Sequence, residues 1–488
     1  MTTNEVAQGH APPLEIRPIF RSGDPNNRID FVFFGDGYTE SEKSKFFDDA
    51  ARLAGEIAQN QTFYTVKPLL NFWAAFTPSV EVKGTELRGV YYARPEVARL
   101  ACTSLGSQCD YPVLLGNDPY YGGLGGEFTV ITPSVKNGAL VLRHELGHSI
   151  IEIGEEYDGG VDGGYFGVDA ANSPETIGWR HWLTNPPAPG EIPRVERMVM
   201  SFQAYPWTTL NVSTVWTGRF LSSGTYPSNF IRFSIAGIPR SDQLTVRLDG
   251  KDIGWAIEEG VGRDRYFYQY LDVEGGGFGD REHEIQFVLN YDDPDRTTEG
   301  SGPQLCSIEV LEYGAPHEFN GSLGHYGVFP TFSATNRTTY RPTNEDCLMR
   351  DVVIPDFCKV CIEELWLRLL KRVSIIENAE SDCRSFIINL LPLAQFRTNE
   401  TLVGTEESYE IVWSRKRKGQ EDWILENFSG KTELALSELD DIKSGDVIAV
   451  AVRFVTEEVR LDEKGYLRDS MEWTIGSECK SGWISVQT

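Results

Sequence analysis

The hydrophobic pattern changes twice along the 488 residues of this chain. Up to about residue 205, apolar runs of strand length alternate with segments of helical spacing, as in 28–34 followed by 46–57. From 206 to 315 apolar and polar residues alternate in short segments, and helical spacing returns at 356–371 before a tail of short strands. Alternating strands and helices predict an α/β region, and period-two runs between turns predict β-sandwiches.

These changes predict three folded units. We expect an α/β (or α+β) domain formed by residues 1–205 and 316–374, an inserted β-sandwich at 206–315, and a C-terminal β-sandwich of immunoglobulin or fibronectin type at 375–488. Cys383 and Cys479 stand near the two ends of the last unit, and we expect a disulfide between them to close it.

Charge and hydropathy exclude two classes of partner. The chain has 45 Lys and Arg against 72 Asp and Glu, a net charge of −27, which repels phosphate backbones and argues against nucleic acid. No apolar run approaches the roughly 18 residues of a membrane-spanning helix, so we expect no membrane insertion.

Cysteine and asparagine usage favours an extracellular protein. Eight Cys could pair in an oxidising compartment, and the chain has six Asn-X-Ser/Thr glycosylation sequons. The first 13 residues have no basic region and no apolar core, so we expect a secreted glycoprotein whose signal peptide is not part of this sequence. The sequons are at Asn60, Asn211, Asn320, Asn336, Asn399 and Asn427.

The strongest chemical signal is His144-Glu145-Leu146-Gly147-His148, in a chain with only seven His. The segment 138–152 has helix length, and positions i and i+4 of a helix lie on one face. Both imidazoles could therefore bind one zinc ion while Glu145 faces a water molecule on it. The alternative is a helix that carries two surface histidines by chance.

A catalytic zinc ion needs a third protein ligand and one open position. Metzincin sites place a Gly three residues and a third His six residues after the second His, but here those positions are Ile151 and Gly154. Glu155 and Glu156 follow directly. A continued helix would carry Glu155 more than about 10 Å past His148, so a ligand there requires a turn near 153–154.

We favour Glu155 as the third ligand, with Glu156 anchoring the loop through hydrogen bonds or an Arg pair. The reverse assignment, and a ligand far downstream as in thermolysin-like enzymes, stay open. Met349 lies in a loop before the helix at 356–371, and we expect its thioether to pack beneath the ligands as the Met of a metzincin-type turn.

In these motifs the chain resembles the IgA peptidase-like metallopeptidases, a family of zinc enzymes related to metzincins. The resemblance covers about 28–205 and 316–372, and it implies a zincin-like metallopeptidase domain with both β-sandwiches outside it. The family has a Gly where this chain has Ile151, and Asp-Glu-Tyr where it has Glu-Glu-Tyr. The motifs are 34–38, 121–123, 144–149, 155–157, 340–343, 347–350 and 357–361.

Two further groups of residues have the side chains of a possible metal site. Asp158, Asp162 and Asp169 lie in a Gly-rich loop and could bind calcium, or form a solvated turn. Cys358-X-X-Cys361 lacks a second Cys pair of matching spacing for a zinc knuckle, so we expect disulfide half-cystines, one of them paired with Cys347.

The expected function is that of a secreted zinc endopeptidase acting on protein or peptide substrates. Glu145 would serve as general base for a zinc-activated water, and backbone at 125–131 would pair with an extended substrate by β-addition. The rival hypothesis is a catalytically silent zincin scaffold whose β-sandwiches bind glycan or protein. An intact Glu145 argues against it, because a silent site does not need the base.

Overall fold

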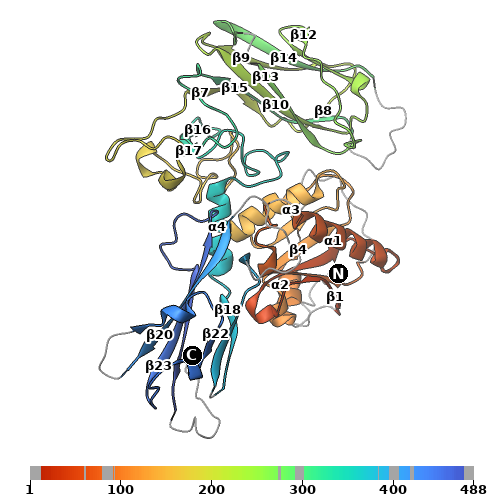
Figure 1. Ribbon diagram of the computed structural model, residues 1–488. Coiled ribbons are helices and arrows are strands. Elements are labelled where there is room, and N and C mark those ends of the chain that lie inside the picture. The colour runs from red at the N-terminus through yellow and green to blue at the C-terminus, as the bar shows by residue number, and fades with distance from the viewer. Residues whose placement is uncertain are drawn as a thin grey trace.

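A computed structural model of the protein describes residues 13–59, 62–79, 92, 94–272, 276–291, 302–382, 384–394, 406–417 and 423–476. The fold is rich in β-sheet and has few helices (Figure 1). A mixed sheet with helices on it lies beside two β-rich regions, one formed by the middle of the chain and the other by its C-terminal part.

The N-terminal part is built on one mixed sheet. β2 (Ile29–Asp36), β3 (Leu70–Phe76), β4 (Tyr111–Gly116) and β6 (Thr129–Ile131) run parallel, and antiparallel β1 (Glu15–Arg21) and β5 (Gly123–Leu124) flank them in the order β1-β3-β2-β4-β6-β5. The four parallel strands confirm the strands expected from the sequence. The free edge belongs to β5, whereas β6 is paired on both sides, so the expected substrate-pairing edge at 125–131 is wrong for β6.

Helices cover both faces of this sheet. α1 (Lys43–Ile57) begins after a capping box of Thr39 and Glu42 and packs with α3 (Gly138–Leu146) on the face that buries Phe31 and Phe33. α2 (Pro95–Ser104) covers the opposite face, with Val32 and Phe34, and a disulfide joins Cys102 in its last turn to Cys109. Buried parallel strands are apolar on both faces for this reason.

The middle of the chain forms two facing sheets. One has the order β13-β10-β15-β7 with β8 beside β15, and the other has the order β12-β11-β14-β9. They share a core of their own, which includes Phe233, Val246 and Phe287. The strands are β7 (Met198–Ala204), β8 (Thr208–Thr209), β9 (Trp216–Ser222), β10 (Ser228–Ala236), β11 (Leu244–Leu248), β12 (Lys251–Asp252), β13 (Tyr266–Asp272), β14 (Arg281–Leu289) and β15 (Gln304–Tyr313).

The chain then returns to the first region. A hairpin of β16 (Phe329–Phe332) and β17 (Thr338–Arg341) leads to the loop that carries Met349 and to α4 (Lys359–Leu370). α4 crosses between the mixed sheet and the C-terminal sheets (Figure 1). Its residues Trp366 and Leu369 belong to one continuous core with both regions.

The C-terminal region has two sheets, with the orders β18-β19-β22 and β21-β20-β23-β24. Cys383 and Cys479, expected to close this region, lie outside the described residues. The strands are β18 (Ile376–Ser381), β19 (Ser385–Leu390), β20 (Glu407–Lys416), β21 (Trp423–Ile424), β22 (Glu433–Ala435), β23 (Val447–Thr456) and β24 (Arg468–Thr474).

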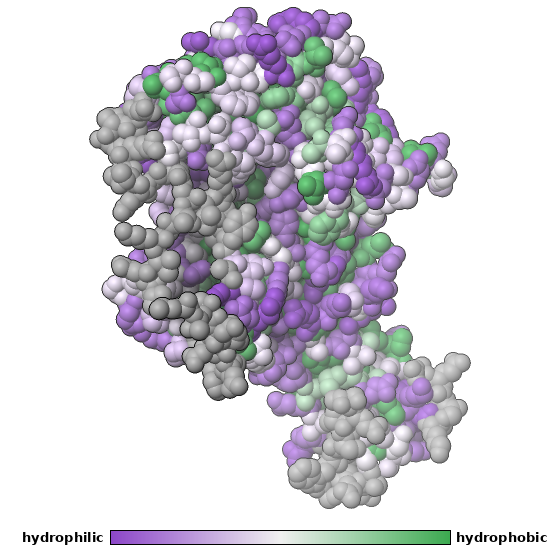
Figure 2. All heavy atoms as spheres, turned by 180° about the vertical axis from the view of Figure 1, so that it is seen from behind, coloured by the Kyte–Doolittle hydropathy of each residue, from purple (hydrophilic) through white to green (hydrophobic). Residues whose placement is uncertain are grey.

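The visible surface is mixed in hydropathy. Figure 2 shows hydrophilic residues interleaved with small, separate groups of hydrophobic ones on the face seen from behind. Within the described ranges, no helix has the length and apolar character needed to cross a bilayer.

Candidate active site

The two histidines of the motif lie where a regular helix changes into a wider one. α3 ends at Leu146, and a π-helical turn follows over Gly147–Ile151, so the predicted helix 138–152 is regular only in its first part. His144 lies on α3 and His148 in the π turn, with their rings edge to face and centroids 4.9 Å apart. Short π segments are frequent at functional sites, because they re-aim side chains.

Both imidazoles are oriented from behind by backbone carbonyls. Nδ1 of His144 lies 3.1 Å from the Leu348 oxygen, and Nδ1 of His148 lies 2.7 Å from the Ile153 oxygen. A carbonyl only accepts, so each Nδ1 carries the hydrogen and donates it. In the neutral tautomer each Nε2 then presents a lone pair, which is the orientation of a metal-binding histidine.

The chain turns sharply between His148 and Glu155. The left-handed residue is Glu152, with φ 62°, one position before the turn expected at 153–154. Gly154 serves a different purpose: a Cβ there would collide with the Gly164 oxygen and lie 2.8 Å from Phe166 N. The N–H of Gly154 donates to the Phe166 oxygen at 2.7 Å, so glycine allows two segments of the loop to approach each other closely.

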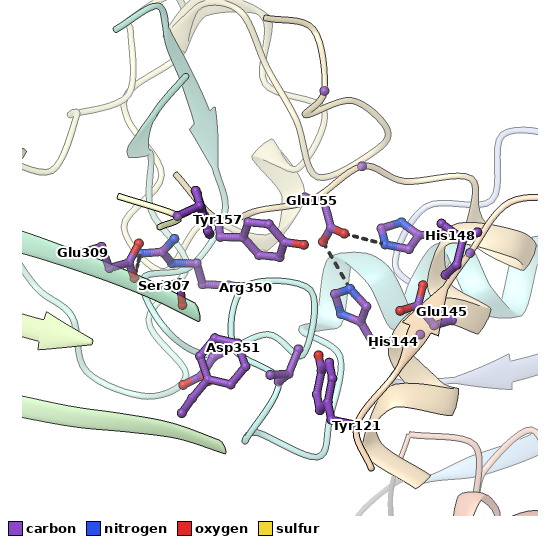
Figure 3. Close-up of a pocket in the computed structure, with 18 of the residues that line it drawn as sticks. Tyr121, His144, Glu145, His148, Glu155, Tyr157, Ser307, Glu309, Arg350 and Asp351 are labelled. Carbon is purple, nitrogen blue, oxygen red and sulfur yellow. Dashed lines mark hydrogen bonds and ion pairs between the residues drawn. The ribbon is translucent and has the colours of Figure 1, made fainter. Parts of the chain in front are cut away.

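This path brings Glu155 between the imidazoles (Figure 3). Its Oε2 lies 3.1 Å from Nε2 of His144, and its Oε1 lies 3.2 Å from Nε2 of His148. Lone pairs of nitrogen and carboxylate at this separation repel unless a proton or cation lies between them. Ligand atoms about 2.0–2.1 Å from a tetrahedral zinc ion are about 3.4 Å apart, so the donor set fits that ion.

The pKa shifts of these groups also favour a cation between them. Burial disfavours the charge on Glu155, but the two imidazoles outweigh burial and hold its pKa well below the usual range. Burial likewise opposes protonation of His148, yet the Glu155 carboxylate raises the pKa of His148 to about 9. The pocket between these groups therefore favours positive charge.

Glu156 faces the other way. Its carboxylate lies in a buried cluster with the thiols of Cys347, Cys358 and Cys361, and its N–H donates to the Met349 oxygen at 3.2 Å. The two adjacent glutamates thus point to different clusters, as expected for neighbouring residues of an extended segment.

Glu145 is buried beside the histidines and beneath β5. A Cβ on Gly123 would collide with its Oε1, and a Cβ on Gly125 would lie 2.5 Å from the Cβ of His148. The two glycines therefore let the edge strand pass directly over the motif. Burial raises the pKa of Glu145 to about 7, a value suited to accepting and returning a proton near neutral pH.

Met349 is fully buried below the pair of histidines. A Cβ on Gly147 would lie 2.8 Å from its Sδ, so the thioether packs against the helix backbone between the two imidazoles. The preceding residue, Leu348, supplies the carbonyl that orients His144. This loop thus supports the histidines from one side.

The structure adds two tyrosines to the predicted site. Tyr157 points at Glu155, and burial together with that carboxylate raises the pKa of Tyr157 well above its ordinary range. Burial raises the pKa of Tyr121 to about 12, and Tyr121 lies near Glu145 at the start of β5. Both belong to motifs quoted for the family resemblance, which was the available signal.

The opposite wall of the site comes from the inserted sheets. A cavity of about 600 Å³ extends from the histidines to β10, β13 and β15. Arg265, just before β13, lies against the rings of Tyr121, Trp207 and Phe267 at 4.9, 4.7 and 4.7 Å. No sequence signal placed Trp207, Arg265 and Phe267 at the site, since more than fifty positions separate each of them from the motif.

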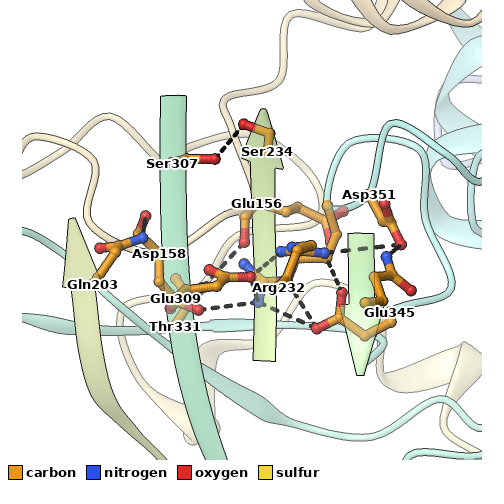
Figure 4. Close-up of polar contacts among 12 residues, drawn as sticks. Glu156, Asp158, Gln203, Arg232, Ser234, Ser307, Glu309, Thr331, Glu345 and Asp351 are labelled. Atoms are coloured by element: carbon orange, nitrogen blue, oxygen red, sulfur yellow. Dashed lines mark hydrogen bonds and ion pairs between the residues drawn. The ribbon is translucent and has the colours of Figure 1, made fainter. Parts of the chain in front are cut away.

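A buried ionic network joins this wall to the Met349 loop (Figure 4). Arg232 of β10 contacts Glu309 of β15 and lies 2.7 Å from Glu345. Arg350, next to Met349, lies 3.2 Å from Glu309, Glu345 and Asp158. The inserted sheets are therefore fixed to the loop that supports the histidines.

The remaining predicted clusters differ from expectation. Asp158 pairs with Arg350, Asp162 is exposed and accepts from Thr335 at 2.6 Å, and Asp169 lies 3.5 Å from the Cys361 thiol, so the three aspartates face different partners and not one calcium ion. The Sγ atoms of Cys358 and Cys361 are 3.7 Å apart and those of Cys347 and Cys361 are 3.9 Å apart. The disulfide expected among these cysteines is not formed.

Comparison with solved structures yields only weak likenesses. A GH26-CBM35 β-(1,4)-mannanase of Podospora anserina has 16% identity and a TM-score of 0.15, over 26% of this chain and 29% of the mannanase. A family 35 carbohydrate-binding module of Clostridium thermocellum has 7% identity and a TM-score of 0.15, over 24% of this chain and 92% of the module. A β-glucuronidase of Ruminococcus gnavus has 12% identity and a TM-score of 0.16, over 63% of this chain and 43% of the glucuronidase. No argument rests on TM-scores this low.

Sequence comparison is more informative. No curated protein matches the chain. Residues 17–179 match the model of the IgA peptidase M64 family. The match spans the mixed sheet, α3, the two histidines and the two adjacent glutamates, and it ends before the inserted sheets and the Met349 loop. Over this segment the chain is similar to the IgA peptidase M64 family.

Proposed function

We propose that the protein is a secreted zinc-dependent endopeptidase, with His144, His148 and Glu155 as metal ligands and Glu145 as general base. The family match supports a metallopeptidase. The observation that carries the finer proposal is the position of Glu155, whose two oxygens lie 3.1 and 3.2 Å from the Nε2 atoms of the two histidines.

The residues of the chain divide the work. A zinc ion in this site supplies Lewis acidity toward the scissile carbonyl and toward water. Glu145 is buried next to the histidines and takes a proton from the attacking water, then returns it to the leaving amine. Leu348 and Ile153 keep the imidazole lone pairs directed at the ion through their carbonyls.

Substrate would bind along β5. This strand is one of the two edge strands of the mixed sheet, and Gly123 and the following Gly125 bring the backbone there against Glu145 and His148. An extended peptide that adds to this edge would place one carbonyl beside the metal, and the inserted sheets would contact its side chains from across the cavity. The substrate class is therefore protein or peptide, and glycan recognition by the sandwiches stays a further expectation.

Secretion is supported by the Cys102–Cys109 disulfide. Among the sequons within the described residues, Asn211 and Asn336 lie on exposed turns, where a glycan could be attached.

The test is Glu145→Gln, which keeps the shape of the side chain and removes the base. Hydrolysis of a peptide identified by cleavage-site profiling should fall by about 10²–10⁴-fold, while the zinc content and the melting temperature stay at wild-type values. Glu152→Gln is the matched control, because Glu152 is exposed on the same segment and pairs only with Arg368. Wild-type turnover in Glu145→Gln would place the hydrolysis elsewhere and favour the scaffold hypothesis.

A further inference from the structure

Three buried thiols meet behind the candidate active site. Cys347 begins the loop that carries Met349, Cys358 caps the N-terminus of α4, and Cys361 lies in the first turn of that helix. All three are at most 2% exposed, and their Sγ atoms lie with a Glu156 oxygen within 4.8 Å of one another. Three Cys and one carboxylate are a donor set that suits a structural zinc ion.

The spacing of the sulfurs fits a metal better than a disulfide. Four ligands about 2.3 Å from a tetrahedral zinc ion place sulfurs about 3.8 Å apart, and the separations here are 3.7 and 3.9 Å. A disulfide requires about 2.0 Å and would leave one of the three thiols unpaired. Redox-active Cys-X-X-Cys pairs need access to a partner, whereas these sulfurs are enclosed.

The carboxylate of Glu156 is aimed into this cluster without a donor. Glu156 is fully buried, neither of its oxygens has a donor partner while both carboxyls are ionised, and its carboxyl lies within hydrogen-bond reach of that of Asp169, so a shared proton or a cation has to lie there. Asp169, also fully buried, has one oxygen in the same condition and the other 3.5 Å from Cys361 Sγ. Buried carboxylates without donors are costly unless a cation or proton compensates them.

The charged groups around the cluster leave room for a cation. Arg341 is near enough to act on Glu156 electrostatically, but its Nε and Nη1 donate to the oxygens of Pro330, Thr331, Thr343 and Asn344, and its Nη2 lies 4.0 Å from Glu345 Oε1. Cys358 N–H donates to Cys347 Sγ at 3.3 Å, a contact that stabilises a thiolate. A divalent ion would balance the thiolates and carboxylates.

We propose that Cys347, Cys358, Cys361 and Glu156 bind a second zinc ion, which is structural and has no open coordination position. The ion joins three segments that position the active site. Cys347 precedes Leu348, whose carbonyl orients His144; Glu156 follows Glu155; and α4 carries the other two thiols. This proposal does not depend on the peptidase activity.

The experiment is zinc stoichiometry with X-ray absorption at the zinc edge on the full chain. The wild type should hold two zinc ions per chain and show sulfur about 2.3 Å from zinc, a shell that the histidine site cannot supply. His144→Ala/His148→Ala should retain one ion with the sulfur shell intact. Cys358→Ser/Cys361→Ser should lose the sulfur shell, and Cys306→Ser, a buried cysteine of β15, is the matched control.

Peptide mapping of the wild type under non-reducing conditions completes the test. It does not require any variant to fold. Zinc without a sulfur shell in the wild type, or a disulfide between any two of Cys347, Cys358 and Cys361, would overturn the proposal. A wild-type protein that holds only the sulfur-bound zinc ion would overturn the proposed function and would still support the thiol site.

Discussion

The two walls of the active-site cavity come from parts of the chain with different character. One wall is local: His144, Glu145, His148 and Glu155 lie within twelve positions, on α3 and the turn after it. The other wall is assembled from β10, β13 and β15, whose residues reach the cavity through the pairing of distant strands. The local wall holds the groups that we propose to be reactive, and the distant wall holds the aromatic and ionic groups that would contact substrate.

We expect the local wall to carry out catalysis and the distant wall to recognise substrate. The local wall lies within the segment that matches the family, and the distant wall lies outside it. The inserted sheets have a core of their own, yet the Arg232 and Arg350 network fixes them to the Met349 loop. Changes in the local wall should therefore abolish turnover or metal binding, whereas changes in the distant wall should alter stability and substrate choice.

The largest effect is expected from removing Glu155. Glu155→Ala takes away the carboxylate between the imidazoles, so zinc affinity at the histidine site should fall by more than about 100-fold and hydrolysis should fall with it. Zinc retention against a chelator measures this. Glu152→Ala, on the same turn but exposed, should retain zinc like the wild type. Unchanged zinc retention in Glu155→Ala would mean that the third ligand lies elsewhere.

A large effect on stability is expected where the walls are joined. Arg232→Met leaves Glu309 and Glu345 buried with fewer cationic partners, and breaking such a pair costs about 3–5 kcal/mol. Urea unfolding followed by tryptophan fluorescence would detect it. The control is Arg219→Met on β9, where an exposed pair with Glu284 contributes at most about 1 kcal/mol. Equal shifts in the two variants would refute the structural role of the network.

A smaller, selective effect is expected within the distant wall. Arg265→Ala removes a guanidinium held among three aromatic rings in the cavity. KM for peptides with an acidic side chain near the cleavage site should rise by about fivefold, with kcat and zinc content unchanged, since one partly exposed charge contact contributes about 1 kcal/mol. Steady-state kinetics on a matched pair of acidic and neutral peptides would measure it. A fall in kcat for both peptides would instead assign Arg265 to the chemistry.

The smallest effect is expected in the C-terminal sheets. Arg453 and Glu410 form a pair 3.3 Å apart, with both side chains more than half exposed. Arg453→Ala should change stability by less than about 1 kcal/mol and leave hydrolysis unchanged. A clear loss of activity would show that this region takes part in substrate binding together with the two walls of the cavity.

The local wall could be predicted because its information is local. Helical spacing predicted the common face of His144 and His148, and the same spacing at 46–57 predicted the helix α1. Spacing alone could not show the π turn at Gly147–Ile151 or the left-handed Glu152, because a non-glycine residue adopts that conformation only when its surroundings impose it.

The distant wall and the thiol cluster depend on contacts that the sequence does not encode by spacing. The separate roles of Glu155 and Glu156 follow from which side of an extended segment meets α4, and Cys347 approaches Cys361 only because the Met349 loop packs on that helix. Likewise Arg265 reaches Tyr121 through the pairing of β13 with β10. Strand register and packing between distant segments decide these contacts.

The most direct measurement of the central claim is a crystal structure with anomalous diffraction collected on both sides of the zinc edge. We expect a zinc peak about 2.0–2.2 Å from Nε2 of His144, Nε2 of His148 and an oxygen of Glu155, with Glu145 adjacent but not bound to it. A zinc-loaded protein with no peak between the histidines, or a peak there whose third protein ligand is not Glu155, would refute the proposed metal site.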